Sequence, residues 1–151
     1  MEKVKLDEPK AKLTLTIRDR EGNVVEVEDD CLFVTVGKQQ LGDLMRGDAA
    51  GKKITHYALG DNGTTPTLSD TALLSEKFRE AIDTTSRTGT TVTITCILEY
   101  AEGNGSGSQV YREAGLFNDP TTGQMYVRAN FPDKTKTGSV QWTLEWQIVF
   151  G

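Results

Sequence analysis

Alternating apolar and polar residues mark three stretches of the chain. Leu13, Leu15 and Ile17 alternate with polar neighbours near the N-terminus, and the same two-residue period recurs over residues 92–100. The pattern is longest over residues 140–150. Successive side chains of a β-strand point to opposite faces of the sheet, so each stretch predicts a strand with one buried face and one polar face.

Turn signals separate further strand-like runs. The polar segment at residues 19–23 (DREGN) predicts a turn, after which residues 24–28 return as a second strand. A Gly- and Ser-rich stretch at residues 101–109 predicts a flexible loop. Residues 31–36 form a short apolar run, other strands are expected at residues 53–59, 110–117 and 125–131, and polar turns at 118–124 and 133–138.

Two segments show helical spacing or helix signals. In residues 37–51, apolar residues recur at the spacing of one helix face, which predicts a short amphipathic helix. In residues 69–82, Ser69 or Asp70 is a suitable N-cap for a second short helix. The sequence does not define where that helix ends, because residues 78–82 also fit a strand.

These elements predict an all-β protein: an antiparallel β-sandwich, jelly-roll-like, with one or two short helices. The order of the elements has no βαβ rhythm, and the sequence shows no internal repeat. A chain of 151 residues suits a single domain. We expect this domain at residues 12–151, preceded by an N-terminal arm at residues 1–11.

The charge of the chain disfavours nucleic-acid and membrane partners. The formal net charge is −5, whereas nonspecific nucleic-acid binding needs clustered Lys and Arg. Lys3 and Lys5 are interspersed with Glu2, Asp7 and Glu8, so a solvated tail is favoured over a nucleic-acid-binding arm. No apolar run approaches the roughly 18 residues of a membrane span. We also expect no signal peptide. The chain is therefore expected to be made in a cytoplasm, where its cysteines stay reduced.

The polar loop at residues 57–76 raises the question of a ligand site. It has no Lys before Ser or Thr, as a phosphate-binding P-loop requires, and no G-x-G-x-x-G turn in a βαβ unit. Its acidic residues do not match the spacing of a calcium-binding EF-hand. Asp61 and Asp70 remain a minor candidate pair for a cation, and a shaped connection is the favoured interpretation.

Other chemistry-bearing residues favour structural interpretations as well. Cys31 and Cys96 lie in apolar runs and are expected to be buried thiols, and with His56 as the single histidine they do not supply a usual zinc site. His56 itself is expected to be packed. A solvated strand face is preferred to a glycosidase carboxylate pair for Glu99, Glu102, Glu113 and Glu145.

The two tryptophans could form an exposed platform that binds sugars, or they could be buried in the core. Trp142 and Trp146 share one face of the last strand, as stacked aromatics of carbohydrate-binding sandwiches do. The same face also carries aliphatic and aromatic residues, whereas the opposite face is polar. Burial of the two rings in the core is therefore favoured.

Four segments in order resemble a family of virion structural proteins of tailed bacteriophages, which comprises small tail, fibre and decoration proteins. They read GDNGTTPTLSDTALLSE, EAGLF, VRANFPDK and WQIVF, at residues 60–76, 113–117, 127–134 and 146–150. The N-terminal LTLTIRDREGNVV also resembles a strand pair that precedes this pattern in some phage proteins. One departure from the family pattern is the Asp-Asn pair after Gly60.

The resemblance implies a β-sandwich with a structural role and no catalytic residues. Within the loop, interpreted as a shaped connection, Gly60 and Gly63 are expected to permit unusual backbone angles, Pro66 to stiffen the exit, and Asp70 with Thr71 to cap the next segment of the chain. Glu113 is similar to a buried acidic anchor of the family and is expected to accept hydrogen bonds from the loop.

The sequence therefore predicts a non-enzymatic bacteriophage virion structural protein that decorates or stabilises the capsid or forms part of the tail or fibre assembly. Expected partners are copies of itself, in a homotrimer, and the major capsid or tail proteins. No catalytic, metal or cofactor site is expected, and no nucleic-acid or membrane partner. The alternative is a carbohydrate-binding β-sandwich module. A small enzyme is a third possibility, which the lack of a convergent polar cluster disfavours.

Overall fold

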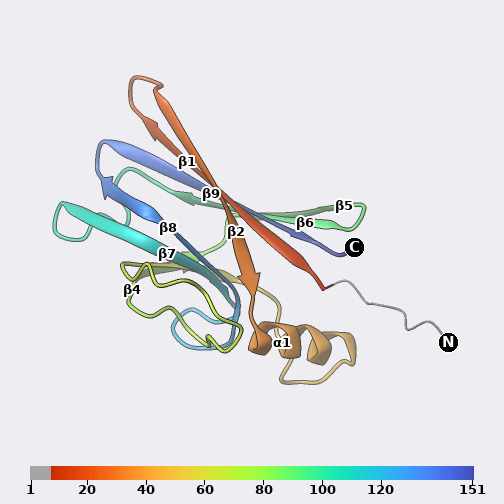
Figure 1. Ribbon diagram of the computed structural model, residues 1–151. Helices are drawn as coiled ribbons and strands as arrows, with labels where there is room; N and C mark the ends of the chain where they lie inside the picture. Colours follow the sequence, from red (N-terminus) through yellow and green to blue (C-terminus); the bar gives the residue numbers. More distant parts are fainter. Residues whose placement is uncertain (1–7) are drawn as a thin grey trace.

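One antiparallel sheet, curled into a half-barrel, forms nearly the whole molecule (Figure 1). The structure is a computed structural model that describes residues 8–151. Its elements are β1 (Lys10–Asp19), β2 (Val24–Phe33), α1 (Thr35–Met45), β3 (His56–Gly60), β4 (Glu76–Ala81), β5 (Thr84–Thr88), β6 (Thr91–Leu98), β7 (Ser108–Phe117), β8 (Met125–Thr137) and β9 (Val140–Val149).

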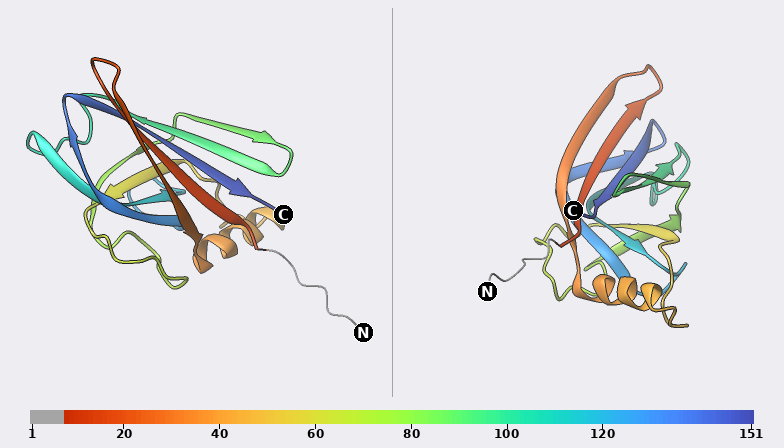
Figure 2. Two further views of the ribbon diagram at one scale, coloured as in Figure 1. Left: turned by 45° about the horizontal axis from the view of Figure 1, so that its top comes forward. Right: turned by 90° about the vertical axis from the view of Figure 1, so that its right-hand side faces the viewer.

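The sheet divides into two layers at β2. The strand order is β4-β3-β7-β8-β2-β1-β9-β6-β5, with every neighbouring pair antiparallel. β2 pairs with β1 along residues 24–31 but with β8 only at Leu32 and Phe33. Strands β5, β6, β9 and β1 therefore form one layer, and β8, β7, β3 and β4 the other, as the two views of Figure 2 show. The prediction of an all-β, sandwich-like antiparallel fold is confirmed.

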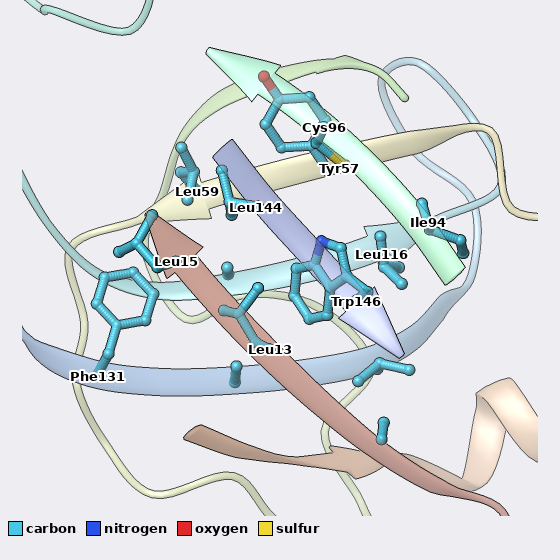
Figure 3. Close-up of a cluster of buried hydrophobic side chains, with 14 of the residues drawn as sticks. Leu13, Leu15, Tyr57, Leu59, Ile94, Cys96, Leu116, Phe131, Leu144 and Trp146 are labelled. Carbon is cyan, nitrogen blue, oxygen red and sulfur yellow. The ribbon is translucent and has the colours of Figure 1, made fainter. Parts of the chain in front are cut away.

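The core fills the space between the two layers (Figure 3). Alternate residues of β1, β6 and β9 point inward and meet side chains from β3, β7 and β8. Trp142 and Trp146 are both fully buried, and the Trp142 ring packs edge-on against Tyr111 with 5.6 Å between ring centroids. The predicted burial of both tryptophans is confirmed.

The single α-helix of the described residues closes one end of the half-barrel. Gly37 lies so close to the backbone of Tyr126 that no larger residue fits without movement. The buried Gln40 accepts hydrogen bonds from Asn118 Nδ2 at 2.9 Å and from the backbone N–H of Lys52 at 3.3 Å. The helix predicted at residues 37–51 is thus confirmed in type, with bounds Thr35–Met45.

The second predicted helix, at residues 69–82, is not formed. Residues 69–75 are turn and irregular structure, and β4 begins at Glu76. The side chain of Asp70 does accept hydrogen bonds at a turn, from the backbone N–H and hydroxyl of Thr67 at 3.0 and 2.9 Å, but no helix begins there. The amides just before β4 instead bind a carboxylate from a distant strand.

Several strands also differ from the prediction: for example, β2 continues to Phe33 and β3 begins only at His56. β8 continues to Thr137, through the residues expected to form a polar turn at 133–138. β5 was not predicted, because all five of its residues are exposed and show no apolar alternation. β1 begins at Lys10, so the last two residues of the expected arm belong to the sheet, while residues 1–7 lie outside the described part.

Candidate functional site

Glu113 on β7 and Arg128 on β8 form a fully buried ion pair on the outer face of the second layer. The register places Glu113 opposite Asn130 and Gly115 opposite Arg128, so the two charged residues are diagonal neighbours. Arg128 Nη2 and Nε lie 2.9 and 3.1 Å from Glu113 Oε2, and neither side chain is exposed. Because a buried charge without a partner is strongly destabilising, each of these residues requires the other.

The Glu113 carboxylate also fixes the end of the loop at residues 61–75. Its Oε1 accepts a hydrogen bond from the backbone N–H of Ser75 at 2.7 Å, and Oε2 accepts one from that of Leu74 at 3.1 Å. A Cβ at Gly60 would overlap the carboxylate, so only glycine fits there without movement. The expected acidic anchor of the loop is confirmed, whereas the placement of Glu113 on a solvated strand face was wrong.

Glu113 lies on the outer face of β7, but that face is not solvated at this point. The pairing of β7 with β8 is irregular between Tyr111 and Glu113. Tyr111 points into the core, and beyond the irregularity Ala114 and Leu116 do so, which leaves Glu113 on the outer face. The loop at residues 61–75 covers this face and buries Glu113, which the alternation pattern did not indicate.

Arg128 holds the middle of the same loop. Its Nη1 donates to the backbone oxygen of Thr64 at 2.8 Å and to Asp70 Oδ2 at 3.3 Å, and its Nη2 donates to the backbone oxygen of Asn62 at 3.3 Å. The sequence alone had suggested no role for this residue. The sequence does contain one signal of its role: Arg128 is the single charged residue in the apolar run MYVRANF, where a buried charge needs a partner.

Side chains at the margin of the buried pair hold the start of the loop. Arg112 Nη1 donates to the backbone oxygen of Asp61 at 3.0 Å, and its guanidinium binds Asp133 at 2.6 and 3.0 Å. This hydrogen-bonded pairing lowers the pKa of Asp133. Asn130 Nδ2 donates to the backbone oxygen of Gly63 at 3.1 Å. The whole loop thus lies on the outer face of β7 and β8.

Apolar contacts complete the attachment. Leu73 inserts between the loop and the sheet, where it forms a second buried cluster whose members include Phe117 and Met125. The guanidinium carbon of Arg79 lies 3.8 Å from the centre of the Phe117 ring, a cation–π contact. The loop is therefore a fixed part of the structure, held by ions, backbone hydrogen bonds and apolar packing.

The two aspartates considered as cation ligands are engaged with other groups. Asp70 faces Arg128, and a hydrogen bond from Ser75, with Lys77 at 3.8 Å, lowers the pKa of Asp61. The described residues contain no group of three or more His, Cys, Asp or Glu side chains placed to hold a metal ion. The residues of this loop act on the protein's own backbone and side chains.

The loop expected to be flexible at residues 101–109 is also anchored. Lys136 is fully buried, and its Nζ donates to Asn104 Oδ1 at 2.9 Å and to the backbone oxygens of Thr137 and Tyr100 at 3.1 and 3.3 Å. Burial lowers the pKa of this ammonium group. The prediction of a flexible loop missed this anchor, since Lys136 stands in a segment read as a turn.

The remaining candidates make separate, local contacts. Cys96 is buried and Cys31 half-buried, both as free thiols, and burial raises the pKa of each. His56 shares a hydrogen bond of 2.8 Å with the hydroxyl of Thr55, and Glu102 accepts one of 2.8 Å from the backbone N–H of Glu99. These interactions are local and structural.

One titratable residue was not expected from the sequence. Glu80 on β4 accepts a hydrogen bond from the hydroxyl of the buried Tyr57 at 3.0 Å, and burial raises the pKa of its carboxyl group, with Glu102 contributing in the same direction. No sequence signal marks it, because its neighbour Glu102 comes from a loop that is distant in sequence.

A mainly apolar hollow of about 330 Å³ opens between α1 and the end of the half-barrel. It contains one charged side chain, Lys53, and none of the predicted catalytic or metal candidates. Its lining residues are Phe33, Leu41, Leu44, Lys53, Ile54, Thr85, Val92, Ile94, Tyr126, Ile148 and Phe150.

Among the described residues, no helix has the length and apolar character needed to cross a membrane. Comparison of the chain with protein families, curated proteins and solved structures found no match.

Proposed function

We propose that this chain is a non-enzymatic structural protein of a tailed-bacteriophage virion, which decorates or stabilises the capsid or forms part of the tail or fibre assembly. The observation that carries the proposal is the convergence of the phage-like segments in one buried cluster. Gly60, Ser75, Glu113 and Arg128 come from three of those segments and meet beneath one loop. Their shared role is to fix a surface loop, which supports an assembly function.

The polar groups in this cluster are used to shape the molecule. Arg128 and Glu113 bind the loop backbone and each other, and Arg128 also binds Asp70 of the loop. A rigid external loop on a β-framework suits a subunit whose surface must match its neighbours. The proposed partners are other copies of the chain, in a homotrimer, and the major capsid or tail proteins.

The carbohydrate-binding alternative has less support. Its sequence motive was an aromatic platform formed by Trp142 and Trp146, and both rings are fully buried in the core. A sugar site on this protein would need other residues. A glycan-binding screen with the purified chain tests the alternative directly, and saturable binding to a defined sugar would favour it.

The proposed function is tested by locating the protein in particles. Virions produced by the strain that carries the gene are purified on a density gradient, analysed by mass spectrometry and labelled with a specific antibody for electron microscopy. We expect a constant copy number per particle and label at one place on the capsid or tail. Absence of the chain from purified infectious particles would refute the proposal.

A further inference from the structure

Strand β2 has an unpaired edge along most of its length. Among the described residues, its residues 24–30 pair with β1 on one side and with no strand on the other, because β8 meets β2 only at Leu32 and Phe33. The hairpin of β1 and β2 extends beyond the other strands in Figures 1 and 2. A free edge of this kind presents backbone N–H and C=O groups to an added strand.

The two faces of this edge differ over residues 25–28, and the inner face ends in the half-buried Asp29, opposite Leu13. Val25 and Val27 lie on the inner face, opposite Ile17 and Leu15 of β1, and Val25 is 55% exposed. The other face carries exposed acidic side chains at Glu26, Glu28 and Asp30. An added strand must therefore present apolar residues on one face and positive charges on the other.

Other open edges carry features that discourage pairing. β5 has only five residues, β4 has six residues of which four are charged, and β8 carries Pro132 beyond its contact with β2. Short strands and edge prolines are recognised protections against unwanted pairing. β2 is ten residues long, contains no proline and keeps apolar surface exposed at Val24 and Val25. This makes β2 the edge best suited to receive a strand.

Pairing of β2 with β2 of a second copy is disfavoured by charge. Such an arrangement brings the acidic faces of two copies of Glu26, Glu28 and Asp30 together across the new ladder. Like charges on neighbouring strands are destabilising. The acidic row thus selects against self-pairing and for a basic strand.

We infer that the free edge of β2 receives residues 1–7 of a second copy of this chain as an added antiparallel strand. That segment, MEKVKLD, alternates Lys3 and Lys5 with Val4 and Leu6. In the antiparallel register that places Lys5 opposite Glu26, Lys3 lies opposite Glu28, Val4 opposite Val27 and Leu6 opposite Val25, while one like-charged pair, Glu2 with Asp29, falls near the end of the segment. The inference rests on the proposed function only in assuming that copies of the chain assemble with one another.

A cross-strand pair in the existing sheet shows the same chemistry. Lys12 Nζ of β1 lies 3.0 Å from Glu28 Oε2 of β2, on the face that the added lysines would share. A lysine on the other side of β2 would place Glu28 between two cations. Charge complementarity of this kind fixes register and partner choice.

The segment of the same copy is poorly placed for this edge. Lys10 begins β1 beside the end of β2 that pairs with β8, and Glu8 binds Lys38 of α1 at 2.8 Å. To reach Val24, the preceding residues would have to turn back past Leu32 and Phe33, where β8 already occupies the edge. A second copy meets no such obstacle.

The test uses a chain of residues 8–151 and a fluorescent peptide of residues 1–9, with fluorescence anisotropy at low salt. Circular dichroism first verifies that the shortened chain is folded. We expect saturable binding that Glu26→Lys with Glu28→Lys weakens by about tenfold or more. A peptide with Lys3→Glu and Lys5→Glu should bind the variant with Glu26→Lys and Glu28→Lys. The same peptide should show no saturable binding to the chain with the natural β2.

Glu145→Lys is the matched control. Glu145 on β9 and Glu28 on β2 are both register partners of Thr14, but Glu145 lies within the sheet and Glu28 on the free edge. Its reversal changes the net charge in the same direction and should leave peptide binding within about twofold. Equal loss in both variants would indicate nonspecific charge attraction and overturn the inference.

Two further outcomes would also overturn it. One is the absence of saturable binding to the folded shortened chain. The other is binding that survives reversal of Glu26 and Glu28 but is lost in Leu44→Asp, which would place the peptide in the apolar hollow beside α1. Peptide binding is measured without virions, so its failure is distinguishable from failure of the proposed function.

Discussion

At the scale of single residues, the buried tryptophans give the sharpest stability prediction. Trp142 is fully buried, and its indole N–H has no hydrogen-bond partner among the described residues. Trp142→Ala should lower the free energy of unfolding by about 3–5 kcal/mol, because a large cavity replaces the ring. Urea unfolding measures this loss. A change below about 1 kcal/mol would contradict the core position.

Trp142→Phe is the informative comparison. The phenyl ring preserves part of the packing and removes an N–H group that is buried without a partner among the described residues, so the loss should be smaller than for alanine. Tryptophan fluorescence of the natural chain should be blue-shifted and resist soluble quenchers. The sequence allowed this burial to be predicted, because every second residue from 140 to 150 is apolar, which defines the buried face of the strand.

At the scale of elements, the loop at residues 61–75 depends on one carboxylate. Glu113→Gln keeps the shape of the side chain but removes the closer carboxylate from the unexposed guanidinium of Arg128 and leaves only Asp70, at 3.3 Å, as a negative partner. We expect a loss of about 3–5 kcal/mol in the free energy of unfolding. Hydrogen exchange at the amides of Leu74 and Ser75 should accelerate, because both donate to this carboxylate.

Asp133→Asn is the matched control for this prediction. The pair of Asp133 and Arg112 has similar chemistry and an N–O distance of 2.6 Å, but the Asp133 side chain is 65% exposed. Exposed pairs contribute about 0–1 kcal/mol, so this variant should remain close to the natural chain. Equal losses in both variants would mean that the buried pair is not the specific anchor of the loop.

The same elements show where the sequence was and was not sufficient. Alternation located β1, β6 and β9, since their inner faces are continuous. The N-cap signal at Ser69 or Asp70 wrongly predicted a helix, because the amides of Leu74 and Ser75 bind Glu113, nearly 40 residues away along the chain. The family resemblance did indicate Glu113 as an anchor. Arg128 and Lys136 were missed, because their partners come from distant loops.

At the scale of the whole molecule, the number of strands and their polar turns were enough to predict an all-β, sandwich-like fold. The separation of β2 from β8 was not predictable, since it depends on which strands become neighbours and where their pairing stops. That separation leaves a sheet with an acidic open edge. A strand donated to this edge by a second copy is a head-to-tail contact, which closes into a ring or propagates. A closed ring of three would give the proposed trimer.

Strand donation makes the stability of the chain depend on its concentration. Binding at about one hundred times the dissociation constant adds roughly 2.7 kcal/mol, which for a domain of this size corresponds to ~5–10 °C in Tm. The Tm of the full chain should therefore rise with protein concentration and fall with added salt, because the inferred pairing sets Lys3 and Lys5 against exposed carboxylates. The chain of residues 8–151 should show neither dependence, as it lacks the donated strand. Calorimetry over a hundredfold range of concentration, with light scattering in parallel, measures both. A Tm independent of concentration in the full chain, or equally dependent in the shortened one, would exclude assembly through this segment.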